Sequence, residues 1–470
     1  MSEQGRWPSP TAANGAPVQD NPTPMRASPR GPLAIRDAHL FETLARFNRA
    51  RPPERVVNAN GAGAFGTFRV TGDITAYTKA SLFAGAGKET PILVRFSTAA
   101  GERGGPDAVR DLRGFAVRFY TDDGNWDLVA SNSPVFFIRD PIKFPEVVRA
   151  RQRHPRTNLP DPAMQWDVWS RTPESLHQIT MLMSDRGIPR SYRHMHGYGG
   201  HAYAFVNADG ARVWVKFHLK SQQGVQILTD DAAMQVMARD PDSHKRDLQT
   251  AIAAGDAPKW TLCVQVMPEA DAARTWYDPF DVTKVWPHAD YPLIEVGEIE
   301  LNRTPGDHVA EVERAAFQPG NLVPGIGISP DEMLQARLIA YGDAQRHRLG
   351  LNHDRLPVNR PRPSAHDRDG AGDGAAVAPD GGEALPRHVN SDAARHGDGA
   401  DTDDTTQAGN LFRRMTPEEQ TRLINTIVAS MADVPDAVQR RQIAHFYRAD
   451  PAYGAGVARG LGIDVADAAE

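Results

Sequence analysis

Apolar and polar residues alternate along several short segments of the chain, which is the pattern of strands that bury one face. The clearest case is a predicted hairpin, in which residues 202–206 and 212–219 flank a turn that contains Asp209 and Gly210. Glycine supplies the positive φ angle that such a turn needs. Further strands are predicted at residues 65–71, 91–98, 114–121 and 126–129. Because no helical pattern separates these strands, the sequence predicts an antiparallel β-barrel.

Helical spacing of apolar residues appears near both ends of the chain. Residues 37–50 place four apolar side chains on one helical face, namely those of Leu40, Phe41, Leu44 and Phe47. Near the C-terminus, the segment 416–419 contains a threonine cap, a proline at the first helical position and a glutamate three residues after the cap. This combination marks the start of a helix. A second apolar helical face follows within residues 438–447.

Composition divides the chain into four parts. Residues 1–33 are rich in Pro, Gly, Ser and Asn, and we predict a mobile N-terminal arm there. The strand patterns fall in a core at residues 34–359. Residues 360–408 are dense in Asp, Gly, Ala and Pro, which predicts an extended, low-complexity wrapping linker. Residues 409–470 then form a predicted C-terminal helical region.

Charge and cysteine content exclude several classes of protein. The formal net charge of the 470 residues is −6, which argues against a nucleic-acid surface because such a surface is basic. No apolar run approaches the roughly 20 residues of a membrane span, and the N-terminus lacks the apolar core of a signal peptide. The single cysteine, Cys263, excludes an internal disulfide, and its alternating strand context predicts a buried structural thiol. We therefore expect a soluble cytoplasmic protein.

The candidate chemistry centres on Tyr341, which has Arg337 four residues before it and Arg348 seven residues after it. Residues four apart lie on the same face of a helix. A guanidinium held beside the tyrosine favours the charged form of the phenol. A phenolate on a rigid helix is a good ligand for ferric iron, although a lone tyrosine is more often a core or interface residue.

The segment around Tyr341 resembles the proximal haem signature of the haem catalases, in which tyrosine is the axial ligand. Further segments resemble the same family in the same order, and together they span about residues 35–360: Pro53–Val57, Gly61–Gly66, Thr90–Thr98, Arg110–Val117, Asn125–Val129, Pro134–Pro145, Ser184–Pro189, Val285–His288 and Ala316–Ile326. The last 60 residues match more loosely, as in the short-subunit, mono-functional type. The resemblance implies an α+β fold with an eight-stranded antiparallel β-barrel, haem b, and catalase or peroxidase activity on hydrogen peroxide in oxidative stress. It also implies a homotetramer with interlaced N-terminal arms.

The resemblance assigns roles to individual residues. Tyr341 is the expected iron ligand, with a polar chain of Arg337, His201 and Asp331 behind it. The residues expected to hold the porphyrin and its propionates are Arg55, Val57, Arg95, Phe136, Phe144 and Arg348. The alternatives are surface salt bridges for the arginines and ordinary core packing for the phenylalanines.

At the two positions that activate peroxide in the family, this chain has different residues. The family has a histidine where this chain has Asn58, and an asparagine where it has Ser131. Ser97 stands beside them as a third catalytic candidate. Ala99 occupies a position where valine is usual, whereas Asp111 keeps a channel carboxylate. The sequence therefore predicts weakened hydrogen peroxide disproportionation, with two alternatives: an enzyme for a larger organic hydroperoxide, or a haem-binding protein without turnover.

Some members of the family also bind NADPH, and a possible site is implied here at His177, Ser184, Arg186, Tyr198, Lys220, Trp286 and His288. Met181 and His196 depart from the family at two further positions of that site. The run Gly61–Gly66 fits the dinucleotide pattern GxGxxG, but that pattern needs a following helix and we predict a strand there. The acidic cluster at 401–404 lacks the order of a calcium loop.

Overall fold

The computed structural model of the protein describes residues 11, 24–34, 37–361 and 402–464. The chain separates into two units, residues 1–53 and residues 54–470. The predicted arm at residues 1–33 and the predicted linker at residues 360–408 fall largely outside the described residues. The four predicted domain boundaries therefore stay predictions.

Eight strands of the second unit close into a barrel, as the sequence predicted. In order around the ring they are β1 (Gly61–Val70), β2 (Glu89–Thr98), β3 (Arg113–Thr121), β4 (Gly124–Ser131), β5 (Gly197–Tyr198), β7 (Arg212–Ser221), β8 (Lys259–Pro268) and β9 (Ile294–Arg303). The ring closes because β7 pairs with both β5 and β8, and every pairing is antiparallel. Two short strands, β6 (Tyr203–Val206) and β10 (Ile326–Ile328), extend the sheet from β7. The predicted hairpin is β6–β7, and Gly210 in its turn has a φ of 81°.

Successive side chains of a strand point to opposite faces, so alternate residues face into the barrel and out of it. The interior is filled by aromatic and aliphatic side chains, including Phe96, Phe115 and Phe217, so the barrel is a packed core. Arg95 and Ser97 alternate with Phe96 on β2 and therefore point outward. Cys263 on β8 is buried, as predicted. The run Gly61–Gly66 lies within strand β1, which confirms that no dinucleotide-binding helix follows it.

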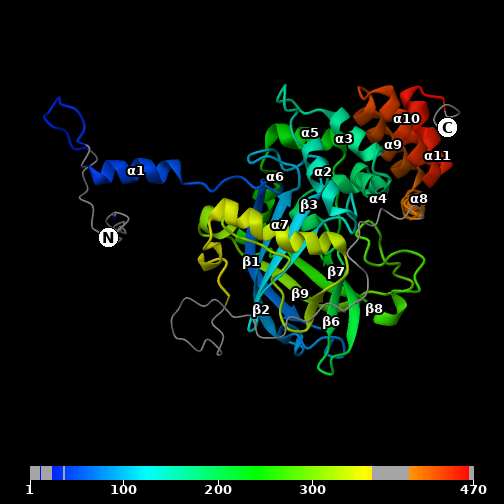
Figure 1. Cartoon of the computed structure of the whole chain (residues 1–470), viewed down its shortest axis with the longest axis horizontal. Coiled ribbons are helices and arrows are strands. Elements are labelled where there is room, and N and C mark those ends of the chain that lie inside the picture. The colour runs from blue at the N-terminus through cyan, green and yellow to red at the C-terminus, as the bar shows by residue number, and fades with distance from the viewer. Residues whose placement is uncertain (1–10, 12–23, 35–36, 362–401, 465–470) are drawn as a thin grey trace, which may run out of the picture. The chain divides into compact units, whose positions relative to one another are not determined.

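A second hydrophobic core lies between helices from the middle and the end of the chain. The middle helices are α2 (Phe144–Ala150), α3 (Pro162–Ser170) and α4 (Leu176–Met183). The C-terminal helices are α8 (Thr406–Arg414), α9 (Pro417–Met431), α10 (Asp436–Ala449) and α11 (Pro451–Leu461), and Figure 1 shows the last three beside α3 and α4. The predicted cap of α9 is confirmed, because Thr416 and Glu419 form a reciprocal capping box. Helix α8 begins at Thr406, three residues before the predicted helical region.

The second unit also contains helices α5 (Asp230–Arg239), α6 (Ser243–Ala253) and α7 (Glu332–Leu349). In the first unit, α1 (Ala38–Asn48) confirms the predicted N-terminal helix. Its predicted apolar face is not buried: Phe41 is 74% exposed and Phe47 is 78% exposed. Among the described helices, none combines the length and the apolar character needed to cross a bilayer.

Candidate functional site

A chain of hydrogen bonds ends on the hydroxyl of Tyr341. Arg337 lies one turn earlier in α7 and donates from Nη2 to that hydroxyl at 2.7 Å. Its Nη1 lies 2.6 Å from Nε2 of His201, and Nδ1 of His201 lies 2.6 Å from a carboxylate oxygen of Asp331. Nη2 of Arg337 also donates to the carbonyl oxygen of Val129 on β4, so the chain joins α7 to the outer face of the barrel. The structure therefore brings together all four residues that the sequence predicted for the proximal side.

The charge states of the residues in this series of hydrogen bonds determine which atom donates in each bond. Burial lowers the pKa of His201, and the charge of Arg337 opposes the effect of Asp331. A neutral imidazole donates from one nitrogen and accepts at the other, so Nδ1 of His201 donates to Asp331 and Nε2 accepts from Arg337. Burial acts against the charge of Arg337, but Tyr341, Tyr203 and Asp331 together raise its pKa above the ordinary value. The guanidinium beside Tyr341 thus stays charged, as the stabilisation of a phenolate requires.

Strand register places the second group of candidates on the same outer face. Ser97 on β2 is directly opposite Gly114 on β3, which is directly opposite Ser131 on β4. Directly paired residues point to the same side of a sheet, so both serines flank Gly114. A Cβ atom at Gly114 would lie 2.4 Å from Oγ of Ser97 and 3.0 Å from Oδ1 of Asn58. Because Gly114 has no side chain, the Asn58 amide can lie against it, between Ser97 and Ser131.

Asn58 is held in an unusual backbone conformation. Its φ angle is 61°, in the left-handed region that asparagine tolerates better than most residues. Its backbone N–H donates to the carbonyl oxygen of Ala99 at 2.9 Å, and its side-chain Oδ1 accepts from the Ser97 hydroxyl at 3.1 Å. Within the described part of the chain, Nδ2 of Asn58 has no hydrogen-bond partner. Two N–H donors are thus available to a ligand at this position.

The hydroxyl of Ser131 is engaged locally. It donates to the carbonyl oxygen of Ser133 at 3.0 Å. The adjacent Asn132 accepts the backbone N–H of Arg113 at 2.8 Å, so its amide belongs to the β3–β4 strand end. Neither residue places a basic group beside Asn58.

Three predicted arginines meet around one residue, Glu313. Glu313 lies 3.1 Å from Arg55 and 3.6 Å from Arg95, measured between side-chain nitrogen and oxygen atoms. Arg348, in the last turn of α7, donates to the Glu313 carbonyl oxygen at 3.0 Å. Arg103 approaches the same carboxylate at 3.4 Å. The sequence predicted neither Glu313 nor Arg103, and only their position between matched segments could have indicated them.

The arginine cluster fits the two propionates of a haem. Burial, together with the charges of Arg95 and Arg348, lowers the pKa of Arg55 well below its ordinary value. Burial also lowers the pKa of Arg348 to about 10. Nε of Arg95 is buried and has no hydrogen-bond partner in the described chain. Surplus positive charge and an unused buried donor both favour an anionic ligand with carboxylate groups.

The predicted aromatic pair lies together near the same face. The rings of Phe136 and Phe144 have centroids 6.4 Å apart, with planes 28° from parallel. Both rings are half-buried and pack with Ala99 at the edge of the second core. Val57, beside Asn58 in the chain, is also half-buried. Their apolar surfaces would suit the faces and edges of a porphyrin.

The predicted channel carboxylate, Asp111, forms an ion pair with an arginine. Its Oδ1 forms a 2.5 Å ion pair with Nη2 of Arg151, and its Oδ2 accepts the backbone N–H of Ala100 at 2.8 Å. Ala100 follows Ala99, whose carbonyl oxygen accepts from Asn58. Sequence reasoning missed Arg151, because the two paired residues are 40 positions apart in the chain.

The residues predicted for NADPH form a partial cluster. The Lys220 ammonium lies 5.0 Å from the ring centre of Tyr198, and His196 and His218 have ring centres 6.3 and 5.5 Å from the same ring. His288 continues the row, with its ring centre 5.6 Å from His218. Burial and the charge of Lys220 lower the pKa of His196 to about 4 and that of His218 to about 3. Burial is the main cause of both shifts, so these imidazoles are neutral near pH 7 and Lys220 is the cation of the cluster.

The other predicted members of that site are more scattered. Arg186 interacts with Tyr198 and contributes to the electrostatics of His177, which is buried in α4. Ser184 caps the turn at Arg186 and donates to the Met181 carbonyl oxygen. Trp286 packs in a separate apolar cluster.

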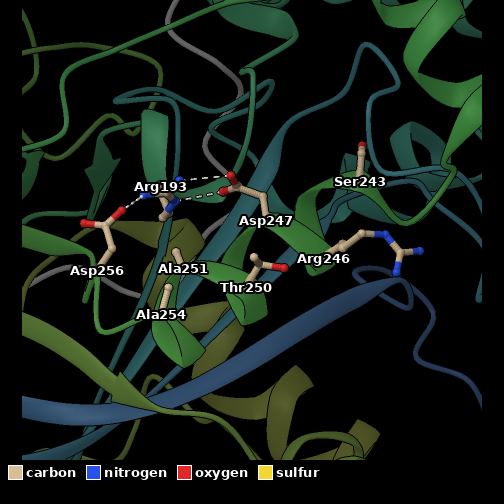
Figure 2. Close-up of a pocket in the computed structure, with 8 residues that line it drawn as sticks. All are labelled: Arg193, Ser243, Arg246, Asp247, Thr250, Ala251, Ala254 and Asp256. Carbon is tan, nitrogen blue, oxygen red and sulfur yellow. Dashed lines mark hydrogen bonds and ion pairs between the residues drawn. The ribbon is translucent and has the colours of Figure 1, made fainter.

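A surface pocket of about 490 Å³ lies along α6 (Figure 2). Arg193 spans it and forms ion pairs with Asp247 and Asp256, each at 2.9 Å. The other arginine of the pocket, Arg246, pairs with Asp240 at 2.7 Å. Because both cations are already neutralised and no predicted site residue lines it, this pocket is not the candidate site.

Comparisons with known proteins agree with this geometry. The chain matches the family described as Catalase over residues 11–384 and the family described as Catalase-related immune-responsive over residues 399–461. It is 52% identical over 474 residues to catalase A of Pseudomonas putida, covering 97% of this chain and 99% of that protein. It is also 52% identical over 478 residues to a catalase of Aliivibrio fischeri, covering 97% and 98%.

Solved structures give the same result. A bacterial catalase superposes with a TM-score of 0.89 at 41% identity, covering 98% of this chain and 97% of that chain. Catalase A of Saccharomyces cerevisiae superposes with a TM-score of 0.87 at 38% identity, covering 96% and 99%. The chain therefore belongs to the catalase family, the haem-dependent oxidoreductases of hydrogen peroxide.

Proposed function

We propose that this protein is a haem b oxidoreductase that acts on peroxides and disproportionates hydrogen peroxide slowly. The observation that carries the proposal is the chain of hydrogen bonds from Asp331 through His201 and Arg337 to the hydroxyl of Tyr341. A charged guanidinium 2.7 Å from a phenol oxygen stabilises a phenolate, and a phenolate is a ligand of haem iron. Relatives named as catalases, at about half sequence identity, support the reaction class.

The polypeptide would bind the cofactor from three sides. Tyr341 would hold the iron, and Arg55, Arg95 and Arg348 would bind the propionates. Phe136, Phe144 and Val57 would contact the porphyrin. When bound, the haem supplies the redox-active iron that the polypeptide itself lacks.

The distal side supports a slow reaction with hydrogen peroxide. Peroxide cleavage needs a group that takes a proton from one oxygen and returns it to the other. The Asn58 amide can donate and accept hydrogen bonds but cannot exchange a proton at accessible pH. Ser131 directs its hydroxyl to the Ser133 carbonyl oxygen. Loss of general acid–base catalysis is worth roughly 10²–10⁴-fold in rate, or about 3–5 kcal/mol of barrier.

The test begins with the absorption spectrum of the protein loaded with hemin. We expect a Soret band that changes in Tyr341→Phe and is unaltered in the control Tyr453→Phe, which removes a buried hydroxyl from α11. Oxygen release from hydrogen peroxide should be measurable but slow in an oxygen-electrode assay. A colourless protein that refuses hemin would contradict the cofactor assignment, and rapid oxygen release would contradict the role given to Asn58.

A second candidate function is the conversion of a larger organic hydroperoxide. It is favoured by the small side chains of Ser131 and Ala99 beside the unengaged Nδ2 of Asn58. Mixing the loaded protein with an alkyl or fatty-acid hydroperoxide tests it through the Soret band and product analysis. If neither peroxide class gives a spectral change or a product, the protein is a haem-binding protein without turnover.

We also propose NADPH as a second cofactor, bound beside Tyr198, Lys220 and His288. The Lys220 ammonium, 5.0 Å from the ring centre of Tyr198, supports an anionic ligand here. Lys220→Met should abolish NADPH fluorescence enhancement if the proposal is correct. From the resemblance alone we add a homotetramer, and a light-scattering mass of a single chain would contradict it.

A further inference from the structure

Glu313 occupies the centre of the arginine cluster and comes from a short π-helical turn, η7 (Val309–Glu313). π-helical turns are rare and occur often at functional sites. The turn presents backbone oxygens as well as the carboxylate: Nη2 of Arg55 donates to the carbonyl oxygens of Val312, Glu313 and Ala315 at 3.2, 2.8 and 3.2 Å. One turn of chain thus holds arginines from distant parts of the sequence.

The charge balance around Glu313 is strongly positive. Four guanidinium groups gather at the turn: those of Arg55, Arg95 and Arg103 contact the Glu313 carboxylate, and that of Arg348 donates to the Glu313 backbone carbonyl oxygen. The side chain of Glu313 is buried. Like charges brought together out of water repel one another and need a counterion. Glu313 is well placed to prevent the four arginines from separating.

We propose that Glu313 is a built-in counterion that organises the propionate-binding arginines and competes with the propionates for them. This inference rests on the proposed function, because it takes the haem as the ligand of the arginines. Before haem binds, the carboxylate holds the guanidinium groups in one place. After haem binds, three carboxylates share four arginines. The carboxylate therefore stabilises the haem-free protein more than the haem-loaded one. Glu313 is a positioning residue, since it acts through the arginines.

The experiment compares Glu313→Gln with Glu311→Gln in thermal melts and hemin titrations. Glu311 lies in the same turn, is half-buried, accepts the backbone N–H of Gly306 at 2.7 Å and forms an ion pair with Arg303 at 3.8 Å, so it controls for loss of a glutamate charge. Each protein is titrated with hemin and with hemin dimethyl ester, which carries no propionate charge. Without hemin, we expect E313Q to melt about 10 °C below E311Q, because removing one partner of a buried ion cluster is strongly destabilising.

Comparing the two porphyrins should separate the effect of the propionate charges from the effect of porphyrin shape. We expect E313Q to bind hemin roughly tenfold more tightly than the wild type, because one charge that repels the propionates is gone. The dimethyl ester should bind both proteins equally. Hemin should therefore recover part of the lost melting temperature of E313Q, whereas the dimethyl ester should recover none of it.

Three results would overturn the proposal: a haem-free E313Q that melts with E311Q, equal hemin affinity in E313Q and wild type, or equal rescue by both porphyrins. If E313Q does not fold, Glu313→Asp decides by the same readouts, since it keeps the charge but shortens its reach to the arginines. The proposed function fails separately, when wild-type protein refuses hemin or Tyr341→Phe leaves the spectrum unchanged. If those tests succeed and E313Q behaves as its control, only the role of Glu313 is wrong.

Discussion

Under the proposed function, replacing Asn58 with histidine should supply the proton transfer that an amide cannot perform, and the structure indicates that a histidine fits. The φ angle of 61° at this position is one that histidine also adopts more readily than most residues. Nδ1 of the imidazole would take the place of Oδ1 of Asn58, which lies 3.1 Å from the Ser97 hydroxyl. That hydroxyl can donate or accept, so it can hold either tautomer. Gly114 leaves space for the ring, because no side chain there crowds it.

The expected gain follows from what the amide cannot do. A correctly placed general acid–base is worth roughly 10²–10⁴-fold, which corresponds to about 3–5 kcal/mol of barrier. We expect Asn58→His to raise kcat/KM for hydrogen peroxide by about 10²-fold or more. Ser131→Asn alone should change it by less than about threefold, since it adds a hydrogen-bond donor and no base. The double variant should exceed Asn58→His, because the added amide can orient the peroxide beside the new base.

The assay is oxygen release at several peroxide concentrations, with the rate expressed per bound haem. Asn58→Gln is the matched control: it keeps the amide and alters only its reach, so it should bring no gain. Adding Ser97→Ala to Asn58→His should reduce the gain, because the imidazole loses its orienting partner. If Asn58→His binds haem with an unchanged Soret band and its rate stays within about tenfold of the wild type, the distal amide does not limit the reaction and this reasoning is wrong.

Three further predictions concern the relay, acid stability and the thiol. Arg337→Leu leaves Tyr341 and His201 without their shared donor, and should shift the Soret band and cost about 3 kcal/mol of stability; an unchanged spectrum and melt would contradict the relay. His244 is fully buried, its two ring nitrogens have no partner in the described chain, and burial lowers its pKa from 6.5 to about 3. Between pH 6.5 and pH 3, the unfolded chain therefore binds a proton at His244 that the folded protein does not bind. The contribution of His244 to the free energy of unfolding is complete above pH 6.5 and is lost as the pH falls toward 3. His244→Phe should reduce the loss of unfolding free energy on acidification by up to about 1.4 kcal/mol per pH unit. Urea melts at pH 7 and pH 5 check this prediction, and an equal loss of stability in the wild type and the variant would refute it. Burial raises the pKa of Cys263 to about 11, so a thiol reagent at pH 8 should label it only after unfolding, and rapid labelling of the native protein would contradict the burial.

Local signals predicted the elements that depend on near neighbours in the chain. The β6–β7 hairpin follows from alternation and a glycine turn, and α9 follows from its capping box, because both involve contacts within a few residues. The pairing of Arg337 with Tyr341 is equally local, since four residues make one helical turn. Most of the remaining site residues came from ordered resemblance to a family, which carries information about distant contacts that spacing alone lacks. Helices α2 to α6 were not predicted, because their hydrophobic pattern is set by burial on several sides.

By itself, the sequence determined the barrel, and it predicted the C-terminal helices, the tyrosine with its arginine, and Asn58 and Ser131 as the candidates at the positions of the family's distal pair. Only the tertiary structure decided that His201 and Arg337, 136 residues apart, meet within hydrogen-bond distance. It also decided that four arginines share Glu313, that Arg151 neutralises Asp111, and that Asn58 lies over Gly114 between two serines. These contacts depend on strand register and on how α7 and η7 pack against the barrel. Packing of that kind is a property of the closed fold, because each contact joins segments whose local patterns contain no information about one another.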